Sequence, residues 1–227
     1  MRSLAVLLIT AAVCSAQSKK APGKAEQPNP AYRVVEDVPG LPRALIIGDS
    51  ISMGYTEPVR KLLEGKFNVH RIPTNGGPTI RGIEQLESWI TAPKQWDLIH
   101  FNFGLHDLRQ DAAGKRQVPL GDYEKNLRQI TARLKKTGAK LVWASTTPVP
   151  EGKVEPPRSD ADVVAYNAVA RRVMEEHGVS MLDLYSLALP RLGAIQRPVN
   201  VHFTDAGSYE LAGHVAAVWK KLVSSGR

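Results

Sequence analysis

The 227-residue sequence predicts an α/β fold, in which a parallel sheet of five strands carries helices on both faces. Two observations lead to this prediction. From about residue 41 onward, five short apolar runs alternate with segments that have the hydrophobic period of a helix. Several of these runs end in glycine followed by polar residues, and open α/β sheets place their chemistry at the carboxyl edge of the strands. We therefore look for functional residues directly after the strands.

Residues 1–16 have the pattern of a secretory signal peptide. Arg2 precedes an apolar run that is too short to span a bilayer, and small residues follow near Ala16. We expect cleavage near Ala16 and a secreted or periplasmic protein. A lipoprotein anchored through Cys14 is the less favoured alternative, since Val13 is larger than the residue usually found before a lipidated cysteine.

The segment that follows the predicted signal peptide differs in composition from the rest of the chain. Residues 17–40 are rich in Pro, Lys, Gln, Asn and Ala, which predicts a flexible linker. The sequence contains no internal repeats. We assign residues 41–227 to one folded domain, which is long enough to bury a core of its own.

The composition excludes several classes of function. Cys14 is the only cysteine, so the mature chain has none for catalysis, zinc binding or disulfides. The formal net charge is +8, but the basic residues are scattered without a recognisable nucleic-acid module, so we expect no nucleic-acid partner. An acidic polysaccharide or a cell-envelope partner is compatible with this charge. No later segment is apolar enough for stable membrane insertion, and the sequence carries no indication of oligomeric state.

The first predicted strand places a serine at the sheet edge. Residues 44–47 are apolar and run into Gly48-Asp49-Ser50, after which a helix continues to Leu63. Ser50 then lies beside the unpaired N–H groups of a helix start, which can stabilise negative charge on an attacked ester carbonyl. Ser50 is therefore a candidate nucleophile. The alternative is that Ser50 merely caps the helix, because Ser and Asp are favoured capping residues.

Two further strands lead to turns at the same edge. The second, over residues 67–72, precedes a turn with Gly76 and Gly77, whose N–H groups are either oxyanion donors or parts of a plain tight turn. A helix from Thr79 to Trp89 follows. The third strand, over residues 96–103, ends in Gly104-Leu105-His106-Asp107, which places His106 and Asp107 near Ser50.

The second half of the chain continues the alternation. Helices are predicted over residues 123–137, 161–177 and 208–222, and strands over residues 140–145 and 179–184. A polar loop at 109–121 and a Pro-rich charged loop at 148–160 overhang the sheet edge and are expected to wall the substrate site.

A histidine stands in the loop before the last predicted helix. His202 can act as the base that a serine hydroxyl needs, if the loop packs beside the sheet edge. Thr204 or Asp205 is the expected helix cap. His214, in contrast, lies among apolar residues within the helix and is taken as structural or surface.

Four segments resemble, in order, the sequence blocks of the SGNH (GDSL-type) serine hydrolases: Gly48-Asp49-Ser50-Ile51, the glycine turn after the second strand, Gly104-Leu105-His106-Asp107 and His202-Phe203-Thr204. The resemblance covers residues 41–222. The resemblance implies a flavodoxin-like three-layer sandwich and hydrolysis of esters through an acyl-serine intermediate, without a cofactor or metal. Ser50 matches the nucleophile and His202 the general base. The implied oxyanion donors are the backbone N–H groups of Ser50 and Gly77 and the side chain of His106. Gly76 is the alternative to Gly77 within the same turn.

The sequence departs from the family pattern at two positions. His106 replaces the usual Asn, which is tolerable because a neutral imidazole retains one N–H donor. Val199 stands where many relatives carry an acid, and Asn200 follows it. Three outcomes are open: a Ser50–His202 dyad oriented by a backbone carbonyl, an acid from elsewhere, or an inactive relative. We favour the dyad, and the candidate supporting residues are Asp49, Asp107, Asn200 and Asp205.

Other classes remain as alternatives. A non-catalytic carbohydrate-binding protein could use tryptophans as sugar platforms; the candidates are Trp89, Trp96 and Trp143. A metal-dependent hydrolase would need ligands from the set His100, His106, Asp107 and His202, which has no helical His-x-x-x-His pair. An α/β-hydrolase elbow requires glycine where this chain has Ser52. We expect a small-molecule or glycan ester as substrate, with short acyl or acetyl groups, although lipid or aryl esters fit the residues equally well.

Overall fold

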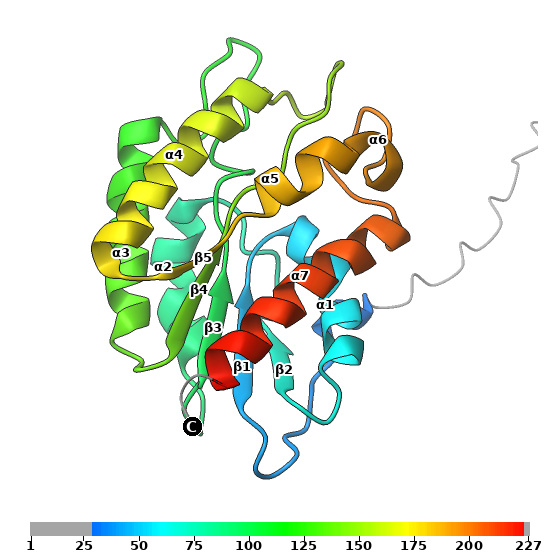
Figure 1. Ribbon diagram of the computed structural model, residues 1–227. Helices are drawn as coiled ribbons and strands as arrows, with labels where there is room; N and C mark the ends of the chain where they lie inside the picture. The colour runs from blue at the N-terminus through cyan, green and yellow to red at the C-terminus, as the bar shows by residue number, and fades with distance from the viewer. Residues whose placement is uncertain (1–28, 225–227) are drawn as a thin grey trace, which may run out of the picture.

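Five parallel strands form the centre of the computed structural model, which describes residues 29–224 (Figure 1). Their order is β2-β1-β3-β4-β5, which is the flavodoxin-like order. The strands are β1 (Arg43–Ile47), β2 (Asn68–Arg71), β3 (Leu98–Phe101), β4 (Lys140–Ala144) and β5 (Ser180–Leu182). The predicted α/β fold with a five-stranded parallel sheet is confirmed.

Helices cover both faces of the sheet (Figure 1). One layer pairs α1 (Ser50–Leu62) with α7 (Asp205–Ser224). The other contains α2 (Thr79–Ile90), α3 (Leu120–Lys135) and α4 (Asp160–His177), packed side by side. Four short segments were not predicted: η1 (Pro30–Tyr32), α5 (Leu184–Ala188), η2 (Leu189–Arg191) and α6 (Leu192–Ile195). None of the helices in residues 29–224 has the length and apolar character needed to cross a bilayer.

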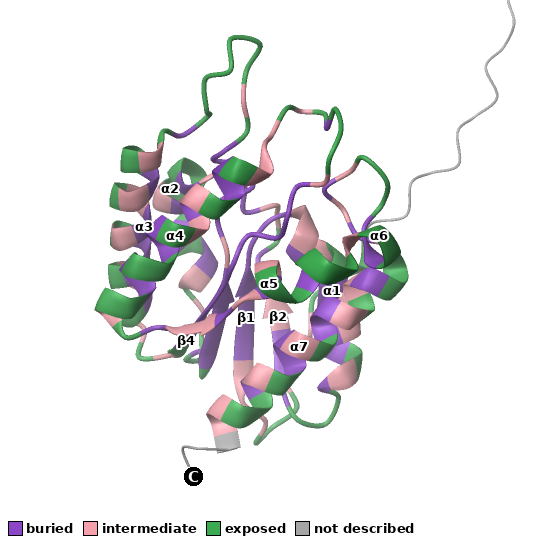
Figure 2. Cartoon of the chain, turned by 45° about the horizontal axis from the view of Figure 1, so that its top comes forward, coloured by how far each residue is buried: buried purple, intermediate pink, exposed green. Residues whose placement is uncertain are grey.

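Burial on both faces explains why the strands read as continuous apolar runs. In β1, Leu45 and Ile47 join the core under α2, α3 and α4, whereas Ala44 and Ile46 join the core under α1 and α7. Successive side chains of a strand point to opposite faces, so a sheet covered on both sides needs an apolar residue at every position. Figure 2 shows the buried strands between exposed outer helix faces.

The N-terminal segment packs against the domain instead of forming a linker throughout. Ala31 is buried, and the Arg60 guanidinium donates hydrogen bonds to the carbonyl oxygens of Pro30 (3.2 Å) and Arg33 (3.3 Å). The Tyr32 hydroxyl lies 3.0 Å from the Met53 sulfur. The predicted linker over 17–40 therefore needs correction in its described part, because composition does not reveal these partners. The predicted signal peptide, residues 1–16, lies outside the described residues.

A buried histidine joins β3 to α1 and α7. His100 Nδ1 accepts a hydrogen bond from the Trp219 indole N–H (3.3 Å), so in the neutral ring Nε2 carries the proton and faces the Tyr55 hydroxyl at 3.0 Å. Burial lowers the pKa of His100 to about 3. A charged ring would place a second N–H against the indole donor, so this site holds neutral histidine.

We expect His100 to make the fold acid-sensitive. In the unfolded chain His100 binds a proton below pH 6.5, whereas in the folded protein it stays neutral down to about pH 3. The stability of the fold therefore decreases as the pH is lowered from 6.5 to about 3. The loss is about 1.4 kcal/mol per pH unit in this window. Urea unfolding at several pH values gives the free energy of unfolding as a function of pH. This free energy should fall less steeply with decreasing pH for His100→Gln than for the wild type. Equal slopes would contradict this account.

Candidate active site

Asp49 caps α1 and leaves the Ser50 hydroxyl free for other contacts. The Asp49 carboxylate accepts a hydrogen bond from the Ile51 N–H at 2.9 Å, as an N-cap residue does. Ser50 is the first residue of α1 and is separated from the end of β1 at Ile47 by Gly48 and Asp49. Ser50 and the β3 turn flank the point where the strand order reverses, which is where open α/β sheets form their binding crevice. The capping alternative for Ser50 is therefore wrong.

Arg71, at the end of β2, braces the turn that carries Ser50. Its guanidinium donates hydrogen bonds to the carbonyl oxygens of Gly48 (2.8 Å) and Asp49 (3.1 Å) and to the Ser52 hydroxyl (2.7 Å). Sequence analysis missed this residue, because an arginine at the end of an alternating strand looks like an ordinary exposed charge.

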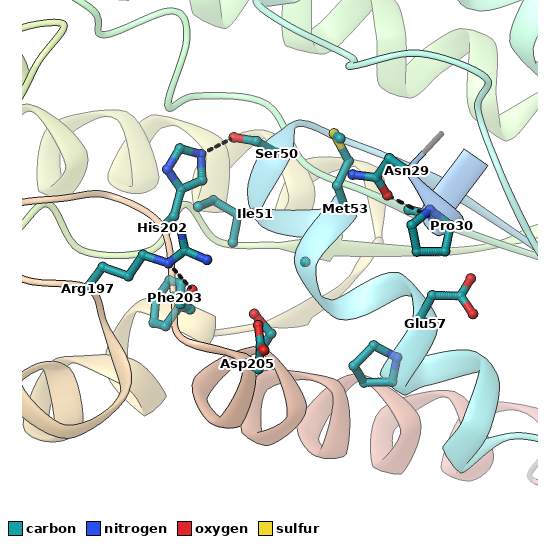
Figure 3. Close-up of a pocket in the computed structure, with 14 residues that line it drawn as sticks. Asn29, Pro30, Ser50, Ile51, Met53, Glu57, Arg197, His202, Phe203 and Asp205 are labelled. Atoms are coloured by element: carbon teal, nitrogen blue, oxygen red, sulfur yellow. Dashed lines mark hydrogen bonds between the residues drawn. The ribbon is translucent and has the colours of Figure 1, made fainter. Parts of the chain in front are cut away.

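Ser50, His202 and Asn200 form a chain of hydrogen bonds. The Ser50 hydroxyl lies 2.9 Å from His202 Nε2 (Figure 3), and His202 Nδ1 lies 2.8 Å from Asn200 Oδ1. Asn200 Oδ1 also accepts the backbone N–H of His202 at 2.9 Å, which fixes the amide oxygen rather than the nitrogen toward the ring. The Nδ1 atom therefore carries the proton, and Nε2 offers its lone pair to the serine hydroxyl.

This arrangement corrects the expected orientation of His202. The side chain of Asn200, and not a backbone carbonyl, orients the imidazole. Val199, at the position of the family acid, is 51% exposed and adopts a left-handed backbone conformation with φ of 50°. Asp205 is exposed and makes no hydrogen bond to His202 in the described structure. Thr204 caps α7 by accepting the Gly207 N–H at 3.0 Å.

The glycine turn after β2 holds its N–H groups in two different ways. The Gly76 N–H donates to the backbone carbonyl of Gly48 (2.9 Å). The Gly77 N–H donates to the Asn75 side chain (2.9 Å), and the φ of 64° at Gly77 favours glycine. A side-chain acceptor can rotate away when an oxyanion arrives, whereas a backbone carbonyl cannot. The contacts therefore favour Gly77 over Gly76 as a donor.

His106 and Asp107 follow β3 but differ in their surroundings. His106 is half-buried, and its imidazole makes no hydrogen bond with the described residues. Burial lowers its pKa, nearby arginines lower it further, and Asp49 raises it. A neutral His106 retains one N–H to donate. Asp107 is fully buried, accepts hydrogen bonds from the N–H (2.8 Å) and hydroxyl of Thr79, and has its pKa raised by burial to about 7. Asp107 thus ties α2 to the β3 turn.

A cavity of about 550 Å³ opens beside Ser50 and His202 (Figure 3). Its walls come from the N-terminal segment at Asn29–Ala31, from α1 at Met53 and Glu57, and from the His202 loop and the start of α7. Sequence analysis missed the first of these walls, because residues 29–31 lie in the predicted linker. No sequence signal identifies them.

The alternative sites are not assembled. Trp89, Trp96 and Trp143 are all buried and present no platform for a sugar. In the proposed metal set, both ring nitrogens of His100 are taken up in the core by Tyr55 and Trp219. Within residues 29–224, no three His, Cys, Asp or Glu side chains come together as a metal site would require.

The parallel sheet and the hydrogen-bonded serine and histidine at its carboxyl edge define an arrangement of the serine-hydrolase class. The chain belongs to the GDSL-like lipase/acylhydrolase family, whose model matches residues 46–209. This match confirms the resemblance to SGNH hydrolases and makes the chain a member of an ester-hydrolase family.

Solved structures share the fold at low sequence identity. The lipase/acylhydrolase from Enterococcus faecalis matches with a TM-score of 0.69 and 19% identity, over 80% of this chain and 96% of its own. The acetyl xylan esterase AlAXEase matches with a TM-score of 0.67 and 17% identity, over 78% and 98%. Axe2, an acetylxylan esterase from Geobacillus stearothermophilus, matches with a TM-score of 0.63 and 20% identity, over 77% and 92%. None of the curated proteins compared with the chain matches it significantly.

Proposed function

We propose that the protein is an exported esterase that removes short acyl groups, acetyl above all, from glycans. Ser50 is the nucleophile, His202 the general base, and Asn200 the residue that positions His202. The observation that carries the proposal is the 2.9 Å contact between Ser50 Oγ and His202 Nε2, in a ring whose tautomer Asn200 fixes.

The proposed reaction has two halves. In the first, His202 Nε2 takes the Ser50 proton while Oγ attacks the ester carbonyl carbon. The N–H groups of Ser50, Gly77 and His106 stabilise the oxyanion, and the protonated His202 then donates its proton to the departing alcohol. In the second half, His202 activates water, which hydrolyses the acyl-serine and frees Ser50.

The character of the cavity supports a polar substrate. Glu57, Arg197 and Asp205 line it together with Met53 and Phe203. A long acyl chain would have to displace water from these charged groups, which is unfavourable unless they find new partners. Two of the similar structures are acetyl xylan esterases, which agrees with an acetylated sugar but does not choose among glycans. Export rests on the pattern of residues 1–16.

A panel of esters tests the proposal. We expect hydrolysis of 4-nitrophenyl acetate and of acetylated xylo-oligosaccharides, with kcat/KM falling as the acyl chain lengthens from acetate to butyrate to octanoate. A preference for octanoate would replace the glycan substrate with a lipid one. A folded protein that hydrolyses none of these esters would contradict the proposed activity.

The proposed role of His106 has its own test. His106→Ala should lower kcat by about 10²- to 10³-fold, the usual effect of losing one oxyanion donor. The KM and the melting temperature should change little, because the side chain is half-buried and its imidazole has no hydrogen-bond partner among the described residues. His106→Asn is the matched control: it introduces the amide that most relatives carry and should keep most of the activity. A near-normal rate for His106→Ala would remove this residue from the site.

A further inference from the structure

The arginines near Ser50 differ from the others in their partners. Most described arginines form salt bridges with Asp or Glu: Arg33, Arg43, Arg60, Arg116, Arg128, Arg133, Arg171, Arg172 and Arg191. The described arginines that form none are Arg71, Arg81, Arg109, Arg158 and Arg197. Arg71 is held by the turn at Gly48, as described above. The other four all lie around the candidate site.

Two of these arginines lie on loops that meet beside His106. The Arg158 guanidinium donates to the carbonyl oxygens of Leu105 (2.8 Å) and Pro156 (3.0 Å), and Arg109 lies in the same turn as His106. The Gln110 N–H donates to the Pro157 carbonyl (2.9 Å), which joins the two loops. The sequence predicts both loops as walls of the substrate site; neither lines the cavity beside Ser50, so they lie on the His106 side of the serine.

The other two lie close to the remaining parts of the site. The Arg81 side chain passes over Gly77, and its guanidinium donates to the Asn75 carbonyl (3.1 Å). Arg197 lines the cavity near His202 (Figure 3), where its guanidinium donates to the Phe203 carbonyl (3.2 Å). Both guanidinium groups therefore donate to neutral backbone carbonyls and to no carboxylate.

Few negative charges balance this group. Asp49 is buried beneath the site and caps α1. Glu57 and Asp205 lie on the α1 and α7 side of the cavity, and Glu57 is engaged by Arg33 and Arg60. Charges of both signs reach the two histidines, because Asp49 raises the pKa of His106 and of His202 whereas Arg158 lowers it. Arg109 and Arg158 form no salt bridge in the described structure, and Asp49 is the carboxylate whose charge reaches Arg158.

We propose that the ester substrate is an acidic sugar, whose anionic group binds Arg109 and Arg158 while its acyl group lies at Ser50. The inference rests on the proposed esterase function and specifies its substrate. The planar guanidinium matches the paired oxygens of a carboxylate, as in a uronic acid, and those of a sulfate or phosphate ester. Arg158 is held in place by two carbonyls, so little of its freedom is lost on binding.

A matched pair of substrates tests this. Acetylated glucuronate and acetylated glucose have the same ring and ester and differ in the carboxylate. We expect kcat/KM to be about tenfold higher for the glucuronate, and this advantage should shrink in about 0.5 M NaCl because exposed charges are screened. Acetylated glucose 6-sulfate, as a third substrate, distinguishes a preference for sulfate from one for carboxylate.

Three variants test the assignment to this arginine cluster. Arg109→Gln should remove much of the advantage of the charged sugars, whereas Arg109→Lys, which keeps the charge, should retain part of it. The control is Arg128→Gln on α3, where the arginine pairs with Glu124 and Glu176. It removes the same charge elsewhere and should leave the glucuronate-to-glucose ratio unchanged.

The outcomes separate this inference from the proposed function. Equal kcat/KM for the charged and neutral sugars, with 4-nitrophenyl acetate still hydrolysed, would overturn the acidic substrate and leave the esterase. If Arg128→Gln and Arg109→Gln lower the glucuronate-to-glucose ratio of kcat/KM equally, the preference comes from the net charge of the protein. That result would overturn the proposed binding of the anionic group by Arg109 and Arg158. Loss of hydrolysis of every ester by the folded protein would overturn the esterase function itself.

Discussion

Ser50→Ala should abolish ester hydrolysis, with kcat falling by at least about 10⁴-fold, as it does when a serine hydrolase loses its nucleophile. The variant should not react with a fluorophosphonate probe, which labels a serine activated by a neighbouring base. Its fold should be intact, since the Ser50 hydroxyl contacts only His202 among the described residues. Turnover of 4-nitrophenyl acetate and probe labelling measure both effects.

Ser208→Ala is a matched control for this experiment. Ser208 lines the same cavity but has no contact with a histidine in the described structure, so its loss should leave labelling unchanged. Labelling that persists in Ser50→Ala would place the reactive serine elsewhere. A well-folded wild type that is never labelled would favour the non-catalytic binding protein.

Asn200→Ala should lower kcat by about 10²- to 10³-fold, because the imidazole loses the acceptor that fixes its tautomer and orientation. The change removes two hydrogen bonds to His202, from its ring and from its backbone N–H. Asn200→Asp retains both acceptors and supplies the carboxylate that many relatives carry, so it should keep or raise kcat at high pH. Steady-state kinetics of the two variants give this comparison.

The same pair of residues predicts a change in pH dependence. Burial lowers the pKa of His202, Asp49 opposes this shift, and Arg197 and Arg158 add to it. The net shift is downward, so the active neutral base persists below pH 6.5. In Asn200→Asp, a carboxylate beside the ring stabilises its charged form and raises this pKa. The acid limb of kcat/KM should therefore lie below pH 6.5 in the wild type and move to higher pH in the variant. An unmoved limb would mean that residue 200 does not contact the titrating base.

The fold, Ser50 and His106 could be predicted from the sequence because they depend on local pattern, and His202 because it stands in the loop before the last predicted helix. Buried parallel strands read as apolar runs, and Ser50 and His106 stand in the turns that follow two such runs. The role of Asn200 could not be predicted in the same way. Its side chain meets His202 because of the backbone path through an irregular loop, including the left-handed conformation at Val199, which a β-branched residue seldom adopts.

The positive charge illustrates a second limit. The sequence shows a net charge of +8 and basic residues that are scattered along the chain. Whether an arginine has a carboxylate partner depends on which helices and loops become neighbours. Arg109 and Arg128 look alike in the sequence, yet Arg128 pairs with Glu124 and Glu176. Only the tertiary arrangement distinguishes them.

The packing of the N-terminal segment on α1 has a practical consequence for preparing the protein. A polypeptide trimmed to begin at residue 41, the domain start that composition indicates, would lack the carbonyl oxygens of Pro30 and Arg33. The buried Arg60 guanidinium would then remain charged with fewer hydrogen-bond acceptors, which is unfavourable. The cavity would also lack the wall that Asn29–Ala31 form. Expression should therefore start upstream of Asn29, and the export cleavage expected near Ala16 leaves this segment in the mature protein.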